Sequence, residues 1–159
     1  MQELSAANFF LVLKSGEIVT PSLSRGTILP GVTRASVLDI VEMFHEELLD
    51  VVRTSTGNPD ITHVKGVERD VLVKDMKDAT EAFVTGTAAE IVPVASVCTG
   101  EKDSEQSINM FKYGEVIPGG PVSIGTKIFI IGNVVISTLM TETFNLLSHN
   151  RSQPKSWKF

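Results

Sequence analysis

The fold is decided by residues 3–34, which read ELSAANFFLVLKSGEIVTPSLSRGTILPGVTR. Apolar, β-favouring residues run from Phe9 to Leu13 and again from Ile18 to Thr20. Between them, Lys14-Ser15-Gly16 supplies the permissive backbone of a tight turn. Pro21 has no amide donor and ends the second run. The stretch therefore begins with a predicted β-hairpin.

The end of the same stretch, Leu29 to Arg34, predicts the start of a helix over residues 33–52. Gly31 lets the backbone turn without a clash at Cβ. Apolar side chains then recur three and four positions apart, at Val37, Ile40, Val41, Phe44 and Leu48. A glycine-led helix start with free amides and the Thr33 hydroxyl suits an anion. Taken alone, such a start more often serves only the helix.

Composition and charge limit the classes of function. The 159 residues suit one domain with a real core, and a hydrophobic content of 42% lies in the globular range. The net charge of -5 and a pI near 5.2 argue against nucleic acid or an acidic membrane as partner. A single phosphate group could still be held by backbone amides.

The side chains that most often bind metals or form disulfides are few. Cys98 is the one cysteine, so an internal disulfide is excluded and a reducing compartment is favoured. Because Cys98 lies in an apolar run, we expect a buried, unreactive thiol. The histidines at 45, 63 and 149 share no metal-ligand spacing, so no metal is predicted.

The middle of the chain alternates loops with short elements. We predict an exposed, mobile loop over 53–66 with its turn at 57–60, a strand over 67–72, a short helix over 73–80, and strands over 81–85 and 90–97 separated by Gly86-Thr87-Ala88-Ala89. The small residues of that last turn would let a ligand approach the backbone closely. Their amides and the Thr87 hydroxyl could hold anionic oxygens. A turn of this kind is also common between strands without any ligand.

The last forty residues give a different pattern. Two β-branched runs, Ile128–Ile131 and Val134–Ser137, surround Gly132-Asn133 and predict a hairpin. The apolar residues from Ile128 to Met140 are too few and too interrupted to span a membrane. Residues 148–159 are polar and basic without periodicity, so we expect disorder there.

The opening stretch resembles the signature of the class IV pyridoxal-phosphate-dependent aminotransferases. The matching positions are Glu3, Ser5, Asn8, Phe9, Phe10, Ile18, Thr20, Leu29, Gly31, Val32 and Arg34. Within that class the phrases Thr20-Pro21-Ser22-Leu23 and Ile28 to Arg34 are most similar to branched-chain amino-acid aminotransferases.

Two later phrases extend the resemblance to about residue 122. Residues 81–94, EAFVTGTAAEIVPV, are similar to the second conserved phrase of the family, and Gly119 to Val122 to a late Gly-Pro-Val phrase. An amphipathic helix follows that phrase in the family, whereas the predicted hairpin follows it here. We therefore divide the chain into a partial class IV domain at 1–122, a divergent apolar segment at 123–147 and a tail at 148–159.

The resemblance implies a fold and a cofactor. The fold would be α/β (α+β), of the D-amino-acid-aminotransferase-like class IV type. Only its larger C-terminal domain would be present, as a β pseudo-barrel with flanking helices. The cofactor would be pyridoxal 5'-phosphate. The partners would be an amino acid and a 2-oxo acid, with a homodimer in the complete family protein, and neither nucleic acid nor a membrane.

The resemblance also assigns residues to the cofactor and the substrate. The carboxylate of Glu3 would pair with the pyridine nitrogen. Val32 and Thr33, at the helix start, would hold the cofactor phosphate together with the Thr87 hydroxyl. The amides of Thr87 and Ala88 would receive the substrate α-carboxylate.

No catalytic residue is assigned, because the Schiff-base lysine of the family lies tens of residues before the position of Glu3. None of the chain's own lysines falls in a matching motif. The implied reaction moves the amino group of leucine, isoleucine or valine to 2-oxoglutarate, and we expect this chain to be inactive alone.

Several alternatives stay open. The chain could be a non-catalytic fragment that binds pyridoxal phosphate or interferes with a dimer, or a fragment that does not fold. It could also belong to another class IV enzyme, a D-amino-acid aminotransferase or an aminodeoxychorismate lyase. No targeting segment is visible after Met1, and the compartment is left open between cytoplasm, mitochondrion and plastid.

Overall fold

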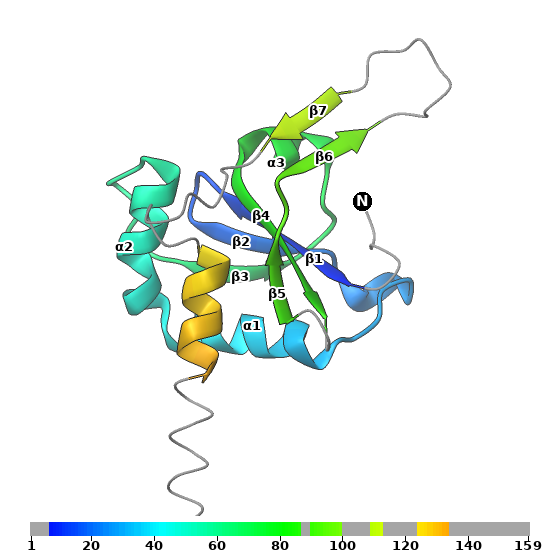
Figure 1. The fold of residues 1–159 in the computed structure, drawn as a ribbon, viewed down its shortest axis with the longest axis horizontal. Coiled ribbons are helices and arrows are strands. Elements are labelled where there is room, and N and C mark those ends of the chain that lie inside the picture. The colour runs from blue at the N-terminus through cyan, green and yellow to red at the C-terminus, as the bar shows by residue number, and fades with distance from the viewer. Residues whose placement is uncertain (1–6, 87–89, 100–108, 113–123, 134–159) are drawn as a thin grey trace, which may run out of the picture.

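The structure, a computed structural model, describes residues 7–86, 90–99, 109–112 and 124–133. Its centre is a five-stranded sheet flanked by helices (Figure 1). The strands of this sheet are β1 (Asn8–Leu13), β2 (Glu17–Thr20), β3 (Lys65–Glu68), β4 (Ala79–Gly86) and β5 (Glu90–Pro93). The predicted α/β class with flanking helices is confirmed.

Helices connect and cover the strands. They are the short 3₁₀ helix η1 (Leu23–Arg25), α1 (Val32–Met43), α2 (His45–Thr56), α3 (Val73–Asp78) and a helical segment over residues 124–133, drawn in orange in Figure 1. A separate two-stranded sheet pairs β6 (Ser96–Thr99) with β7 (Asn109–Lys112). Within the described ranges, no helix has the length and apolar character that a membrane crossing needs.

The strand order is β3-β2-β1-β4-β5, so the sheet of the described residues is open, with β3 and β5 at its edges. The predicted hairpin is confirmed, because β1 and β2 pair in antiparallel fashion and β2 ends at Thr20, before Pro21. Gly16 adopts a φ of 89°, which few other residues tolerate, in the turn between them. β2 and β3 are parallel, whereas β4 pairs in antiparallel fashion with both β1 and β5.

Side chains alternate between the two faces of the sheet and build two cores. The first core, under α1, α2 and the 124–133 helix, contains Phe10, Val12, Ile18, Val37, Val41, Leu48, Val52, Ile61, Val64, Phe83, Ile124 and Ile128. The second, on the face that carries α3, contains Phe9, Leu11, Leu13, Val19, Val71, Met76 and Ala82. The central strand β1 is buried along its whole length, because it supplies both cores.

The prediction of one continuous helix over 33–52 is wrong. The chain leaves helical geometry at Phe44, with φ -121° and ψ 31°, so two helices form instead of one. Figure 1 shows α2 standing steeply against α1. Each helix can therefore direct its own apolar stripe into the first core, α1 through Val37 and Val41 and α2 through Leu48 and Val52.

The loop predicted over 53–66 is shorter and better anchored than expected. α2 continues to Thr56 and ends at Gly57, whose φ of 65° caps it. Ile61 and Val64 are buried in the first core, and Ile61 lies directly against Gly16 of the hairpin turn. β3 then begins at Lys65, two residues before the predicted strand. Burial of these two apolar side chains ties the loop to the sheet.

Two further strand predictions need correction. The apolar run over 90–97 divides into β5 and β6, since the chain leaves the large sheet after Pro93. The amide of Val94 still donates to the carbonyl of Ala82, over 2.8 Å. The side chain of Cys98 lies outside the described part, so its expected burial stays a prediction. The short helix predicted over 73–80 is confirmed as α3, although β4 already begins at Ala79.

The hairpin predicted around Gly132-Asn133 is wrong, because residues 124–133 are helical. Ile124 and Ile128, four positions apart, are both fully buried in the first core, which is helical spacing. A short run of β-branched residues fits the spacing of a strand as well as that of a helix. The helix forms here because it buries Ile124 and Ile128 against the sheet and α1. Residues 113–123, 134–147 and the tail at 148–159 lie outside the described part of the chain.

The buried carboxylate of Glu81 holds the start of this helical segment. It accepts hydrogen bonds from the amides of Ile124 and Gly125, each over 2.9 Å. Amides at a helix start lack partners within the helix, and negative charge there also complements the helix dipole. One side chain of β4 therefore connects the sheet to residues more than forty positions later.

On the other face, α3 is held by Asp75. Its buried carboxylate accepts two hydrogen bonds from the Arg69 guanidinium, at 2.8 and 3.0 Å, and one from the amide of Leu72 at 2.7 Å. These contacts, the Arg69 hydrogen bonds first, lower the pKa of Asp75 below its ordinary value of 3.8, against the opposing effect of burial. The same pair raises the pKa of Arg69.

We predict that Glu81→Ala lowers the free energy of unfolding by roughly 2 to 4 kcal/mol, because two buried amides lose their acceptor. Glu81→Gln, which keeps one acceptor oxygen, should lie between this variant and the parent. The measurement is urea denaturation followed by circular dichroism. Asp39→Ala, at an exposed position in the middle of α1, is the control and should differ little from the parent. Equal stability of parent and Glu81→Ala would contradict this account of the helix start.

Asp75 should make stability depend on pH. A carboxyl whose pKa is lower in the folded state stabilises the fold above its unfolded pKa and loses this contribution as pH falls through the folded value. We therefore expect the stability difference between the parent and Asp75→Asn to be largest above about pH 5 and to shrink as pH falls below 3.8. Urea denaturation across this pH range measures it, with Asp60→Asn at an exposed turn as control. A difference that does not change with pH would contradict the assignment.

Candidate functional site

The start of α1 presents free backbone donors at the surface. Gly31 is its N-cap, and the first backbone bond of the helix runs from the amide of Ala35 to the carbonyl of Gly31 over 3.0 Å. The amides of Val32, Thr33 and Arg34 therefore have no acceptor within the helix. Among the described residues no side chain caps this end. Three donors with the positive end of the helix dipole behind them make a cradle for an anion.

Asn8, at the beginning of β1, fixes the segment that leads into this cradle. Its buried side-chain amide donates to the carbonyl of Leu29 over 2.9 Å, and the Gly31 amide donates to the same carbonyl over 2.8 Å. The Asn8 carbonyl oxygen lies so close to Gly31 that a Cβ at that position would collide with it. The first core strand and the helix start are thus in direct contact, and a side chain at position 31 would have to displace the Asn8 amide group.

Arg34 anchors the same helix turn from behind. Its guanidinium is buried, donates to the carbonyl of Pro21 over 2.8 Å and forms an ion pair with Glu68 of β3. Thr20, beside Pro21, donates its hydroxyl to the carbonyl of Phe9 over 2.8 Å. These contacts commit the Arg34 charge to the scaffold. The anion cradle therefore consists of backbone amides and not of this cation.

A mostly apolar pocket of about 450 Å³ lies on one flank of α1. It is lined by Val32, Thr33, Ser36, Val37 and Ile40 of α1, Ile91 of β5, and Ile128, Phe129, Gly132 and Asn133. Val32 at its mouth is 80% exposed. The pocket and the amide cradle share Val32 and Thr33, so they form one continuous surface.

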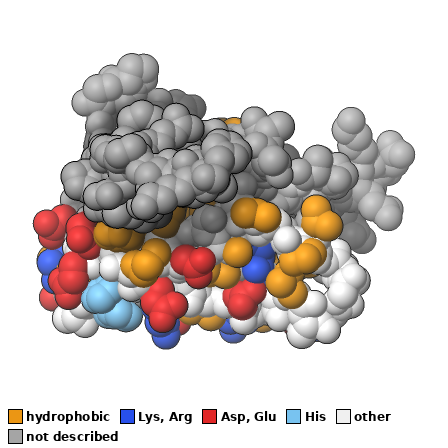
Figure 2. Space-filling view, turned by 90° about the horizontal axis from the view of Figure 1, so that it is seen from below, with side chains coloured by type: hydrophobic (Ala, Val, Ile, Leu, Met, Phe, Trp, Pro, Cys, Tyr) orange, Lys and Arg blue, Asp and Glu red, His pale blue; other side chains and the backbone are white. Residues whose placement is uncertain are grey.

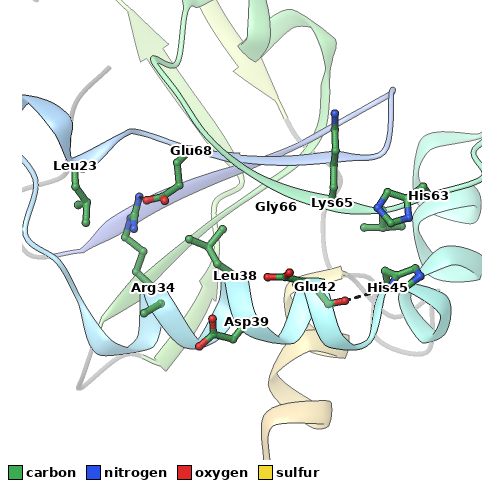
Figure 3. A pocket seen from close by; sticks show the side chains of 12 residues that line it. Leu23, Arg34, Leu38, Asp39, Glu42, His45, His63, Lys65, Gly66 and Glu68 are labelled. Carbon is green, nitrogen blue, oxygen red and sulfur yellow. Dashed lines mark hydrogen bonds and ion pairs between the residues drawn. The ribbon is translucent and has the colours of Figure 1, made fainter.

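A wider groove of about 870 Å³ lies on the other flank, between α1 and β3 (Figure 3). Figure 3 shows Arg34 and Glu68 directed toward each other at one end and the rings of His45 and His63 together at the other. The two rings are 4.8 Å apart between centroids, and His45 Nδ1 lies 3.2 Å from the carbonyl oxygen of Glu42.

This groove brings together two histidines that share no metal-ligand spacing in the sequence. Even so, no group of three or more metal-ligating side chains occurs within the described residues. His149 lies outside them. The face seen in Figure 2, from the α1 side, carries acidic side chains and histidine interspersed with hydrophobic ones. The groove is thus mixed in charge, whereas the pocket beside the cradle is apolar.

The structure describes only part of the predicted site. Val32 and Thr33 lie at the α1 start, as the prediction requires. Glu3, Thr87 and Ala88 lie outside the described residues, so their roles stay predictions. β4, which leads to Thr87, pairs with β1 so that Thr85 lies opposite Asn8. The described end of that strand therefore lies next to the residue that holds the cradle.

Sequence reasoning did not assign functional roles to Asn8, Arg34 or Thr85. Asn8 and Arg34 stand inside the signature that carries the resemblance, which is a signal that could have singled them out. Thr85 is fully buried, and its hydroxyl has no hydrogen-bond partner in the described structure. No sequence pattern separates such a hydroxyl from an ordinary strand threonine.

Comparisons with known proteins identify the family of this chain. The family model described as amino-transferase class IV matches residues 1–97. A mitochondrial branched-chain-amino-acid aminotransferase of Arabidopsis thaliana is 42% identical over 97 residues, which is 61% of this chain and 20% of that protein. A methionine aminotransferase of the same plant is 36% identical over 115 residues, covering 72% of this chain and 25% of its own length.

Similar chains also occur among solved structures. The branched-chain amino acid aminotransferase of Escherichia coli is 28% identical, and the overlay covers 59% of this chain and 25% of that one. Its TM-score of 0.43 is too low for the overlay itself to show the fold. The chain spans about a fifth to a quarter of the length of these relatives. Since the family model covers well over half of the 159 residues, the chain belongs to the class IV aminotransferases.

Proposed function

We propose that this chain supplies the cofactor-phosphate site of a pyridoxal-phosphate-dependent aminotransferase. The enzyme would transfer the amino group of leucine, isoleucine or valine to 2-oxoglutarate. The observation that carries the proposal is the start of α1, where Val32, Thr33 and Arg34 present free amides without a side-chain cap among the described residues. Family membership supports the reaction class.

The residues fit a phosphate group. Backbone amides at a helix start bind phosphate without a full positive charge on a side chain, which suits a chain of net charge -5. The Thr33 side chain adds a hydroxyl at the same helix turn. When bound, pyridoxal phosphate supplies an electron sink, while the protein provides binding and orientation. The cradle would hold the phosphate end and so fix where the ring lies relative to the sheet.

The other assigned residues complete the proposal. Glu3 would pair with the pyridine nitrogen, the Thr87 hydroxyl would add to the phosphate contacts, and the Thr87 and Ala88 amides would receive the substrate α-carboxylate. Negative charge at the position of Glu3 would keep that nitrogen protonated. The pairing of β4 with β1 supports this arrangement, because it directs the chain toward the cradle just before Thr87.

The substrate assignment rests on the relatives. Several of them are named branched-chain-amino-acid aminotransferases, which supports leucine, isoleucine and valine. The methionine aminotransferase among them makes methionine a second candidate. Both substrate classes have apolar side chains of similar size, so an apolar binding site serves either.

The whole reaction would need residues beyond these 159. The lysine that the family uses has no counterpart in them, so we propose that the chain binds cofactor but does not transaminate alone. The apolar surface at Val32, Phe129 and Ile130 is exposed and supports a covering partner, which in the complete family protein would be the rest of the subunit or its dimer mate. A non-catalytic fragment that occupies such a partner is the alternative.

The test is Val32→Pro. Val32 is the first residue of α1, where proline is well tolerated, and Gly31 before it already has the extended ψ of 138° that proline prefers. The substitution removes one cradle amide and leaves the helix intact. We expect pyridoxamine 5'-phosphate to bind at least about tenfold more weakly, because a hydrogen bond to a charged group is lost. Calorimetry measures it on the 159-residue chain.

Val73→Pro is the matched control, since Val73 is the exposed first residue of α3 and lies on the other face of the sheet. It should bind pyridoxamine 5'-phosphate as the parent does. Pyridoxamine without phosphate should bind weakly to all three proteins. If the parent binds both ligands equally, or if Val32→Pro binds like the parent, the phosphate site is elsewhere.

A further inference from the structure

Two buried polar side chains lie side by side beneath the cradle. Asn8 of β1 and Thr85 of β4 are directly paired across the sheet, so their side chains are on the same face. That face is the one covered by α1, because Phe10 and Phe83, two positions along from each, stack on each other in the first core. Asn8 touches Gly31 at the start of α1. Asn8 and Thr85 therefore form a buried polar pair between the sheet and the start of α1, which we call the polar floor of the cradle.

Asn8 determines where the cradle amides lie. It and the Gly31 amide share the Leu29 carbonyl, so the turn before α1 is closed by two hydrogen bonds on one acceptor. Its oxygen also packs against Gly31. Loss of the Asn8 side chain would release both contacts and let the first helix turn shift, although Asn8 itself contributes no amide to the cradle.

The Thr85 hydroxyl makes no hydrogen bond within the described structure. It is fully buried, and no hydrogen-bond partner exists for it among the described residues. An unsatisfied buried hydroxyl lowers stability, and valine would fill the same volume without that cost. Thr20, at the end of β2 in the same sheet, shows the contrast, since its buried hydroxyl donates to the Phe9 carbonyl. The Thr85 hydroxyl lowers stability as it stands and lies beside the anion cradle, which suggests that its hydrogen-bond acceptor is the bound ligand or a water molecule that comes with it.

We propose that Asn8 and Thr85 form part of the anion site: Asn8 is a positioning residue for the cradle amides, and the Thr85 hydroxyl donates to the bound phosphate group or to a water molecule that the phosphate orders. This inference rests on the proposed function. It adds two residues that the assignments of Glu3, Val32, Thr33 and Thr87 do not include.

Thr85→Val and Thr20→Val should have opposite effects on stability and on ligand affinity. Thr85→Val removes an unsatisfied hydroxyl, so its stability in the absence of ligand should equal or exceed that of the parent. Its affinity for pyridoxamine 5'-phosphate should fall by about fivefold or more. Thr85→Ser, which restores the hydroxyl, should recover most of that affinity. Thr20→Val loses a satisfied buried hydrogen bond, so it should be less stable yet bind with parental affinity.

A double-mutant cycle tests the positioning role of Asn8. Gly31→Ala should destabilise the parent strongly, because its Cβ collides with the Asn8 oxygen. In the Asn8→Ala background the same substitution should cost clearly less, since the obstructing atom is gone. Asn8→Ala alone should weaken pyridoxamine 5'-phosphate binding by about fivefold or more and leave the weak binding of pyridoxamine unchanged.

The outcomes separate this inference from the function on which it rests. If the parent does not distinguish pyridoxamine 5'-phosphate from pyridoxamine, the phosphate site itself is overturned, and this inference with it. If the parent does distinguish them but Thr85→Val and Asn8→Ala bind like the parent, only the polar floor is overturned. If the stability changes of Asn8→Ala and Gly31→Ala simply add in the double variant, Asn8 does not position the cradle. If Thr85→Val is less stable than the parent, the Thr85 hydroxyl already has a hydrogen-bond partner.

Discussion

The contact between Asn8 and the Leu29–Gly31 segment is the constraint on which the arrangement depends. It joins the first residue of the central strand to the first turn of α1, on the face of the sheet that carries the first core. The buried guanidinium of Arg34 then ties the same helix turn to Pro21 and Glu68. Because both anchors lie within three residues of the helix start, the backbone amides there are held with little freedom. Donors fixed before a ligand arrives lose little entropy when it binds.

α1 also separates two surfaces of different chemistry. Its Val32 and Thr33 flank faces an apolar pocket, and its Arg34 flank faces a groove of mixed charge that contains the His45 and His63 rings. The anion cradle opens on the side of the apolar pocket, with which it shares Val32 and Thr33. The pocket wall formed by the 124–133 helix depends in turn on Glu81, which holds its first amides. The Glu81 carboxylate on β4 thus holds the helix that forms one wall of the apolar pocket, although the two are more than forty residues apart in the sequence.

Much of this could be predicted from local pattern, and the failures have physical causes. The hairpin, the glycine-led helix start and α3 follow from turn chemistry and apolar spacing, so they were predicted correctly. The break at Phe44 was missed because the apolar spacing continues through it with neither proline nor glycine. The run Ile128–Ile131 was predicted to be a strand because β-branched residues satisfy both periods, and packing against α1 decided for a helix. The unpaired Thr85 hydroxyl and the pairing of Arg34 with Glu68 are tertiary, so no spacing in the sequence indicates them.

The central claim is that the amides at the start of α1 receive the phosphate of the cofactor. The most direct measurement is a titration of the isotope-labelled chain with pyridoxamine 5'-phosphate, followed through the backbone amide signals in heteronuclear NMR spectra. The account predicts that the amide signals of Val32 and Thr33 shift most, in proportion to saturation, and that pyridoxamine without phosphate leaves them in place. Shifts concentrated at His45 and His63 in the opposite groove, with Val32 and Thr33 unmoved, would contradict it.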